Sequence, residues 1–483
     1  MNILDNPFFR QQAYISGQWC DADNNKETLD VTDPATGKTI GKIPNMAASE
    51  ARKAIQAAHD ALPEWRALTG HQRARLLQNW FRLVSENKKQ LAEIMTLEQG
   101  KPLAEAEGEI VYAASFIEWF AEQGKRTNGE IIPSPTVDKR LMVIKQGVGV
   151  CAAITPWNFP AAMVTRKAAP ALAAGCTMVI KPANETPFTA LALVALAIQA
   201  GIPAGVINIL TGHSRIIGET FTTDDRVRKL SFTGSTEVGR LLMRQCSGSI
   251  KKVSLELGGN APFIVFDDAD VEKAVEGAIA AKFRNAGQTC VCVNRFYIHQ
   301  AIYPAFSQRF IEEVQKLKVG NGFEQGTQIG PLINAKSADK VQSLLDDALN
   351  KGADLLFGGQ RHALGDNFFM PTVLGNVAGN SLLLEEEIFG PVAPLVIFDD
   401  EDSVIESANN TIYGLAAYFY TENSQRIWQV SEKLEYGMVG INTGLISNEV
   451  APFGGVKQSG LGREGSSHGI EDYLELKYLC QGF

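Results

Sequence analysis

The segment from Val148 to Leu257 repeats one pattern, in which a short apolar strand is followed by a helix. The strand segments, such as 177–181 and 229–233, are rich in small and β-branched residues, and helix-starting signals such as Thr186-Pro187 stand between them. Strands that alternate with helices predict a parallel sheet with helices on both faces, the doubly wound α/β arrangement. Ligands of such sheets bind beyond the carboxyl ends of the strands.

Polar groups stand where several of these strands end. Asn158 follows the first strand, Lys181 closes the second, and the Gly234-Ser235 turn follows the strand at 229–233. Because the carboxyl ends of parallel strands share one edge of the sheet, these groups are expected to meet at one site.

The rest of the chain extends this plan on both sides. Helical periodicity is expected over 71–86 and 103–123, and a second series of strands and helices begins near residue 261. The strand at 141–145 follows a loop that contains proline, and it is interpreted as an arm that projects from the body. The residues from 471 onward alternate apolar and polar side chains, as a terminal strand does.

Composition excludes several classes of protein. Hydrophobic residues make up 45% of the 483 and charged residues 20%, as in ordinary globular domains. The net charge of −9, without a long run of Lys or Arg, disfavours nucleic acid and anionic membranes as partners. The longest apolar stretch, 190–198, is too short to span a membrane, and the first residues lack a secretory signal, so a cytoplasmic protein is expected. Six scattered histidines and seven cysteines without CxxC spacing predict neither a metal site nor a disulfide framework.

Two patterns near the C-terminus match known signatures without their structural context. Residues 460–465 satisfy GxGxxG, but a dinucleotide-binding glycine loop needs a preceding strand and a following helix. Residues 465–469 satisfy GxSxG around Ser467, but no apolar strand leads into it as a nucleophile elbow requires. Both are interpreted as loop glycines, and a serine hydrolase is the disfavoured alternative.

Cys290 and Glu256 are the strongest candidates for covalent chemistry. Cys290 follows Gly287-Gln288-Thr289, a small and polar setting in which a thiolate can react, unlike the apolar run around Cys151. Glu256 stands between two leucines at the end of a buried strand, which should raise its pKa and suit a general base. From the residues alone, a structural cysteine and a turn-capping glutamate are open alternatives.

Several motifs together resemble the aldehyde dehydrogenase superfamily, collinearly from about residue 14 to the end. The motifs are TPWNFP (155–160), KPANETP (181–187), FTGSTEVG (232–239), LELGGNAP (255–262), GQTC (287–290) and EEIFGPV (386–392). The resemblance implies a Rossmann-like cofactor domain (1–125 and 147–258), an α/β catalytic domain (259–458) and a small β oligomerisation arm (126–146 and 470–483). In this arm, the strand at 139–145 would pair with the C-terminal strand of a neighbouring copy, in a homo-oligomer that is a dimer or a tetramer.

The resemblance also implies roles for individual residues. The Cys290 thiolate would attack the aldehyde carbon, the Asn158 amide and the Cys290 backbone N–H would hold the oxyanion, and Glu256 would activate the water that hydrolyses the thioester. NAD or NADP would accept the hydride. Lys181 and Glu387 would bind its two riboses. The full set implied to bind the cofactor is Thr155, Pro156, Trp157, Lys181, Asn184, Gly212, Gly234, Ser235, Glu387 and Phe389.

Two finer expectations concern specificity. Members of the family that prefer NAD commonly carry a glutamate at the position of Asn184, whereas a neutral asparagine beside Lys181 would admit a 2′-phosphate, so NADP is expected to be preferred. Arg166, Arg284 and Ser447 are similar to the carboxylate-binding set of members that oxidise succinate semialdehyde, as in γ-aminobutyrate breakdown. Two guanidinium groups and a hydroxyl can bind a carboxylate directionally. Glutarate semialdehyde is the alternative substrate, and an ion pair with a structural acid is the alternative role for either arginine.

Cys292 lies two residues after the predicted nucleophile, as in the same members of the family. A Cys290–Cys292 disulfide would close a small, strained and easily reduced ring, which predicts reversible oxidative inactivation. The alternative is a small residue that fills a tight turn.

Overall fold

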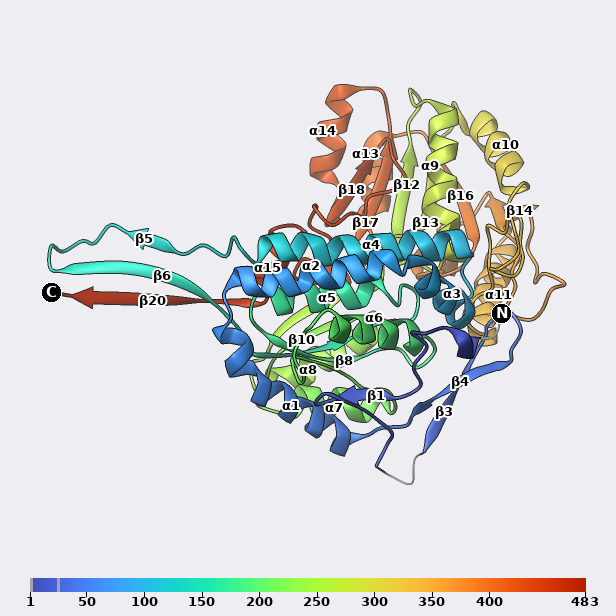
Figure 1. The fold of residues 1–483 in the computed structure, drawn as a ribbon. Coiled ribbons are helices and arrows are strands. Elements are labelled where there is room, and N and C mark those ends of the chain that lie inside the picture. The colour runs from blue at the N-terminus through green and yellow to red at the C-terminus, as the bar shows by residue number, and fades with distance from the viewer. Residues whose placement is uncertain (1–2, 24–26) are drawn as a thin grey trace.

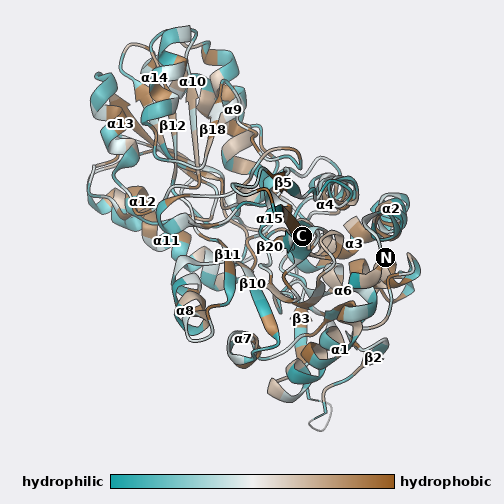
Figure 2. Cartoon of the chain, turned by 90° about the vertical axis from the view of Figure 1, so that its left-hand side faces the viewer, coloured by the Kyte–Doolittle hydropathy of each residue, from teal (hydrophilic) through white to brown (hydrophobic). Residues whose placement is uncertain are grey.

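The computed structural model describes residues 3–23 and 27–483, and it contains two α/β parts and a projecting arm (Figure 1). One part is built on an eight-stranded sheet with the order β19-β11-β10-β7-β8-β9-β1-β2, and the other on a seven-stranded sheet with the order β14-β15-β16-β13-β12-β17-β18. Figure 2 shows the helices of the first part, such as α1 and α8, at one end of the molecule and those of the second, such as α10 and α14, at the other. The predicted α/β fold class is confirmed.

The eight-stranded sheet is parallel at its centre and antiparallel at its edges. Strands β11, β10, β7, β8 and β9 run parallel, whereas β1 and β19 run antiparallel to their neighbours. The strand bounds are β1 Ala13–Ile15, β2 Gln18–Cys20, β7 Val150–Ile154, β8 Thr177–Lys181, β9 Ile207–Ile209, β10 Val227–Thr233, β11 Lys252–Glu256 and β19 Gly460–Leu461. Because helices cover both faces, β8 is buried along its whole length, which explains its unbroken apolar run TMVI.

Eight helices of this part have their bounds in the described residues. They are α1 Ala48–Ala67, α2 Gly70–Glu86, α3 Lys88–Gln99, α4 Leu103–Gln123, α5 Ala162–Ala173, α6 Pro187–Gln199, α7 Ser214–Thr223 and α8 Thr236–Ser247. A separate hairpin joins β3 (Thr28–Thr32) to β4 (Thr39–Pro44). Helix α4 runs along the boundary between the two parts (Figure 1), and the Leu103 N–H donates to the Gly322 carbonyl of the second part at 2.9 Å.

The seven-stranded sheet has its own core of apolar residues between its strands and helices. Its strands are β12 Ala261–Val265, β13 Val293–His299, β14 Asp354–Phe357, β15 Thr372–Gly375, β16 Val392–Phe398, β17 Ala416–Tyr420 and β18 Met438–Ile441. Its helices are α9 Val271–Phe283, α10 Tyr303–Val314, α11 Ala335–Asn350, α12 Leu382–Glu385, α13 Glu401–Asn409 and α14 Ser424–Lys433. The short helix α15 (His468–Glu471) then leads back toward the first part.

The arm consists of β5 (Glu130–Ile132), β6 (Lys139–Gly147) and β20 (Leu474–Gly482), in the order β20-β6-β5. The prediction that its central strand pairs with the C-terminal strand of a neighbouring copy is wrong. β6 pairs antiparallel with β20 of the same chain, from Gly147 opposite Leu474 to Lys139 opposite Gly482. The Val148 N–H donates to the Tyr473 carbonyl at 3.0 Å, so the start of β20 lies beside the end of β6. The two strands therefore pair within one chain.

Candidate active site

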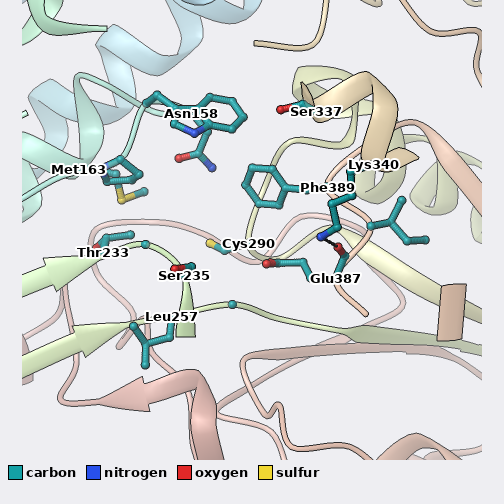
Figure 3. Close-up of a pocket in the computed structure, with 15 residues that line it drawn as sticks. Asn158, Met163, Thr233, Ser235, Leu257, Cys290, Ser337, Lys340, Glu387 and Phe389 are labelled. Atoms are coloured by element: carbon teal, nitrogen blue, oxygen red, sulfur yellow. Dashed lines mark hydrogen bonds between the residues drawn. The ribbon is translucent and has the colours of Figure 1, made fainter. Parts of the chain in front are cut away.

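A pocket lies where β7, β10 and β11 end, between the two α/β parts. It brings together Asn158, Cys290, Glu387 and Phe389, which the sequence predicted for one site (Figure 3). The residues that line it are Pro156, Trp157, Asn158, Met163, Thr233, Gly234, Ser235, Leu257, Gly258, Cys290, Ser337, Lys340, Glu387, Ile388 and Phe389. In Figure 3 the Cys290 sulfur and the Asn158 amide reach into this pocket from different loops.

Cys290 sits on a loop whose conformation is closely constrained. Asn285 and Ala286 have φ values of 52° and 54°, and Gly287 continues the left-handed stretch at 76°. A β-carbon at Gly259 would lie 2.3 Å from the Cys290 carbonyl oxygen, so this glycine permits the loop to approach β11. Burial, and then the Glu256 carboxylate, raise the pKa of the Cys290 thiol. The resting thiol is therefore protonated at neutral pH and needs a base before it can attack.

Two hydrogen-bond donors stand beside the thiol. The Asn158 side-chain amide donates to the Gln288 carbonyl at 3.0 Å, and its second N–H is left over, since an amide nitrogen carries two. Within residues 3–23 and 27–483, no hydrogen bond uses the Cys290 backbone N–H. A pair of fixed donors next to a nucleophile is the arrangement that stabilises an oxyanion.

Glu256 ends β11 with its side chain buried and both carboxyl oxygens without a hydrogen-bond partner. Burial, and then the nearby Glu464 carboxylate, raise the pKa of Glu256 to about 8. Burial alone would raise the pKa of Glu464 too, but Lys167 and Arg166 hold it below its ordinary value. The two carboxyls thus differ: Glu464 carries charge in an ion pair, and Glu256 can take up or release a proton near neutral pH.

The cofactor-side residues form two groups. Trp157 and Phe389 meet edge to face at 5.5 Å in the pocket wall, where Ser235 also caps helix α8 by accepting the Val238 N–H at 3.4 Å. Burial raises the pKa of Glu387 to about 7, against the opposing effects of the Gly259 N–H and of Lys340. The N-terminus of α8 and the aromatic Trp157–Phe389 wall fit a phosphate-bearing aromatic cofactor.

The second cofactor-side group lies outside the pocket wall. The Lys181 ammonium donates to the Asn184 side-chain oxygen at 2.8 Å, and the Asn184 amide donates to the Gly212 carbonyl at 3.0 Å. The Thr155 N–H donates to the Lys181 carbonyl at 3.1 Å, which ties this group to the pocket loop. Burial lowers the pKa of Lys181 to about 8. An ammonium that is hydrogen-bonded to a neutral amide, without a carboxylate acceptor in residues 3–23 and 27–483, suits a site for an additional anion.

Comparison with known proteins agrees with this site. A sequence model of the aldehyde dehydrogenase family matches residues 19–479. The chain belongs to the aldehyde dehydrogenase family. It is 62% identical over 482 residues, all of both chains, to a succinate-semialdehyde dehydrogenase (NADP+) of Escherichia coli, and 62% identical over 480 residues, 99% of each, to a glutarate-semialdehyde dehydrogenase of Pseudomonas putida. A crystal structure of an E. coli NADP-dependent enzyme superposes with a TM-score of 0.98 at 62% identity, over 99% of both chains.

The three residues predicted to bind a substrate carboxylate differ in their burial and contacts in this aldehyde dehydrogenase. Arg166 is 1% exposed, forms an ion pair with Glu464 at 2.8 Å, and lies 3.9 Å from the ring centroid of Phe453. An ion pair with a structural acid, the alternative role considered for either arginine, therefore holds for Arg166, although its Nε and Nη2 atoms still lack a hydrogen bond of acceptable geometry. Ser447 is half-buried and belongs to the same segment as Phe453. Because the Phe453 ring contacts the Arg166 guanidinium, this segment packs against Arg166.

Arg284 is the guanidinium that lacks an acid. It is half-buried, and in the part of the chain that the structure describes no carboxylate lies within ion-pair distance of it. Its Cζ lies 5.4 Å from the centroid of the Phe159 ring, next to the loop of Asn158. This cation lies six positions before Cys290 in the sequence. Burial and Glu256 raise the pKa of the thiol, and Arg166 and then Arg284 act against that rise, so the charge of Arg284 acts on the site.

Cys292 is buried behind the nucleophile. Its Sγ lies 3.4 Å from the Lys282 carbonyl and 3.5 Å from that of Val293, and both Cys290 and Cys292 are free thiols. A disulfide between them would require Cys292 to leave these contacts.

The glycine pattern at 460–465 has a structural role. Gly460 and Leu461 form β19, and a β-carbon at Gly460 would lie 1.8 Å from the Leu255 carbonyl oxygen. Glu464, inside the pattern, pairs with Arg166 and Lys167. These glycines close the edge of the eight-stranded sheet rather than line the pocket.

Sequence reasoning did not anticipate several buried charged residues around the site. Glu98, at the end of α3, accepts the Phe188 and Thr189 N–H groups at 2.6 and 2.8 Å and so caps α6 in place of the Thr186 side chain. Lys101 and Glu109 form a second buried pair near Asn158. They lie in the charge-rich segment 98–109, where no sequence pattern separates a buried charge from a solvated one or reveals its partner.

Two features, a membrane-spanning helix and a metal-binding cluster, are absent from the described residues. Across residues 3–23 and 27–483, no helix is both long and apolar enough to cross a membrane. Over the same ranges, no cluster of His, Cys, Asp and Glu side chains is arranged to hold a metal ion.

Proposed function

We propose that this aldehyde dehydrogenase oxidises succinate semialdehyde to succinate, with NADP+ preferred over NAD+. The observation that carries the proposal is Arg284, a half-buried guanidinium whose charge acts on Cys290 and which has no ion pair among the residues that the structure describes. Arg284 is not among the residues that line the pocket, but a cation beside the Asn158 loop favours an aldehyde with a terminal carboxylate over an uncharged one. The 62% identity to a succinate-semialdehyde dehydrogenase (NADP+) over the full chain supports the same substrate.

The first half of the reaction forms a bond at Cys290. The Glu256 carboxylate oxygens have no hydrogen-bond partner among the described residues, and Glu256 takes the proton of the Cys290 thiol. The thiolate attacks the aldehyde carbon, and the carbonyl oxygen becomes an oxyanion between the Asn158 amide and the Cys290 backbone N–H. A nicotinamide cofactor held in this site would supply the hydride acceptor, and loss of the hydride would leave a thioester on Cys290.

The second half releases the acid. After Glu256 has released the thiol proton to solvent, its carboxylate accepts a proton from a water molecule, and the resulting hydroxide attacks the thioester carbon while the same donors hold the oxygen. The bond between this carbon and the Cys290 sulfur then breaks, which releases succinate and leaves a Cys290 thiolate that regains the proton from Glu256. Trp157 and Phe389, together with Pro156 and Glu387, would hold the nicotinamide end of the cofactor, and Gly234 and Ser235 at the start of α8 would face its pyrophosphate. Lys181, Asn184, Gly212 and Thr155 would hold the adenosine end.

Arg284→Ala is expected to raise KM for succinate semialdehyde about tenfold to a hundredfold, because a hydrogen bond between charged groups is lost. KM for pentanal, which has similar length and no charge, should change less than about threefold. Initial rates with both aldehydes measure the difference. Equal losses on both substrates would contradict a carboxylate site. Arg166→Ala is the less specific variant, since it also leaves Glu464 buried without its partner.

The competing substrate is one methylene longer. Glutarate semialdehyde is the alternative, and the P. putida relative at 62% identity carries that name. A pocket discriminates one methylene by about 1–3 kcal/mol, so kcat/KM for the two semialdehydes, measured in the same assay, decides between them.

Asn184→Glu is expected to lower the ratio of kcat/KM for NADP+ to that for NAD+ at least about tenfold, because a carboxylate would face the 2′-phosphate. Asn184→Gln is the matched control, since it has the length of glutamate without its charge. If the glutamine variant moved the ratio as far as the glutamate variant, side-chain size rather than charge would set the preference.

The arm is proposed to join copies of this chain in a dimer or tetramer in the cytoplasm. Its strands leave apolar side chains exposed, with Ile131 83%, Leu476 68% and Tyr478 59% accessible. A second copy would cover them.

The Cys290–Cys292 pair is proposed as a reversible oxidation site. Support comes from two free thiols two residues apart, one of them half-buried in the pocket. Their bridge would be strained and thus easily reduced.

A further inference from the structure

The start of helix α4 holds two active-site loops at once. Glu105 and Glu109 are four residues apart, so they lie on one face of the helix. Glu105 accepts the Asn285 N–H at 2.8 Å, in the loop that leads to Cys290. Glu109 accepts the Ala161 and Ala162 N–H groups at 2.9 and 3.2 Å, at the start of α5, where the loop that carries Asn158 ends. The spacing of two carboxylates on a rigid helix therefore sets the spacing of the two loops.

Lys101, just before α4, adds a third contact. It is 2% exposed, and its ammonium donates to the Glu109 carboxylate and to the Asn158 backbone carbonyl, the latter at 2.8 Å. The ammonium also lies 4.1 Å from the centroid of the Phe159 ring. Its polar contacts thus run to Glu109 and to the residue whose side chain would hold the oxyanion.

A buried amide then joins the two loops directly. The Asn285 side chain donates to the Asn158 carbonyl at 3.1 Å and to the Gln288 carbonyl at 3.2 Å, and its oxygen accepts from Gln99 at 3.0 Å. The Asn158 amide donates to the same Gln288 carbonyl. One N–H of Asn158 is thereby fixed, which orients the other N–H relative to Cys290.

Stability alone does not explain why a charged group is used here. Buried ions lose hydration, and apolar side chains of similar volume often hold a helix equally well. An apolar residue at position 101 would, however, leave the Asn158 carbonyl without its ammonium donor. Beyond packing, Lys101 supplies a directional hydrogen bond to the Asn158 carbonyl.

We propose that Lys101, Glu105 and Glu109, here called the α4 clamp, set the geometry of the oxyanion hole, and that Lys101 is a positioning residue for aldehyde oxidation. This inference rests on the proposed function, because it acts through Asn158 as oxyanion donor. Lys101 contacts neither the thiol nor the substrate site, so its effect is on kcat and not on binding.

Lys101→Met tests the clamp, with Lys229→Met as the matched control. Lys229 is also buried, donates to a neighbouring side chain (Ser254) and lies over an aromatic ring, Tyr473, at 4.8 Å. Lys101→Met is expected to lower kcat about tenfold to a hundredfold with KM changed less than about twofold. Lys229→Met is expected to lower Tm without lowering kcat more than about twofold.

Three further measurements separate positioning from folding. In Lys101→Met/Glu109→Gln no buried charge is left unpaired, so Tm should recover while kcat stays low. Alkylation of Cys290 by iodoacetamide, which needs no oxyanion hole, should keep its wild-type rate in Lys101→Met. In an Asn158→Ala background, Lys101→Met should lower kcat by less than about twofold, since the group it positions is already gone.

Three results would overturn the clamp. They are equal losses of kcat in the two lysine variants, recovery of kcat together with Tm in the double variant, and an undiminished effect of Lys101→Met in the Asn158→Ala background. All variants are assayed with succinate semialdehyde and with pentanal. A wild-type enzyme that oxidises pentanal but not succinate semialdehyde would refute the proposed substrate, and the clamp would still be decided with pentanal.

Discussion

Cys290→Ala is expected to lower kcat/KM for aldehyde oxidation at least about 10,000-fold, because the nucleophile is removed and no other group takes its place. The pocket around it, with Asn158 and the Trp157–Phe389 wall, should stay intact. NADP+ binding, followed by quenching of protein fluorescence, is therefore expected to change little. Initial rates of NADPH formation give the loss.

Cys20→Ala is a suitable control, since Cys20 is also half-buried but lies on β2, away from the pocket. Its kcat/KM should stay within about twofold of wild type. Aldehyde oxidation that survived Cys290→Ala would refute the thioester mechanism. Ester hydrolysis that survived it would revive the serine hydrolase alternative at Ser467.

Glu256→Gln is expected to lower kcat about 100- to 10,000-fold, the usual contribution of a general base. The carboxyl, whose pKa is raised to about 8, is a base only when it is deprotonated, so the wild-type rate should rise with pH through about 8. The glutamine variant should lose that rise. Rates between pH 6 and 9.5 measure both effects, and a variant that kept the wild-type pH profile would contradict the assignment.

Glu98→Gln is the matched control for this pH profile. Burial raises the pKa of Glu98 to about 8 as well, but its oxygens are bonded to the start of α6 and not to the pocket. Both raised pKa values favour the protonated, folded form. Their contribution to stability is present below the ordinary pKa of 4.5 and is lost as the pH rises through about 8. The glutamine control should therefore alter the pH dependence of Tm and leave the pH–rate profile in place.

The sheet and its ligand edge could be predicted from sequence because local periodicity encodes them. The alternation from residue 148 onward predicts β7, β8 and β10 close to their observed bounds, and Asn158 and Ser235 follow strands as expected. Helix α3 gave no clear signal, since its buried face includes the polar side chains Glu98 and Gln99. A hydrophobic pattern predicts which apolar residues are buried, and it does not reveal a helix whose buried face carries polar side chains.

Partners that are distant in sequence account for the other failures. The ion pair of Arg166 with Glu464 joins α5 to the C-terminal glycine segment, and no local pattern links them. The alternation in 474–482 correctly predicts a strand, but a strand has the same period whether it pairs within its chain or with a neighbour. Periodicity therefore predicts β20 but not the strand with which it pairs.

The pairing of β20 with β6 places the end of the chain on the arm, with Phe483 74% exposed and the Phe483 N–H bonded to the Asp138 carbonyl at 3.0 Å (Figure 1). A purification tag fused after Phe483 would thus sit beside the strands proposed to hold two copies together, though far from the pocket along the fold. A tag at the N-terminal end leaves that surface free, so it is the better choice for measuring both assembly and turnover on one sample.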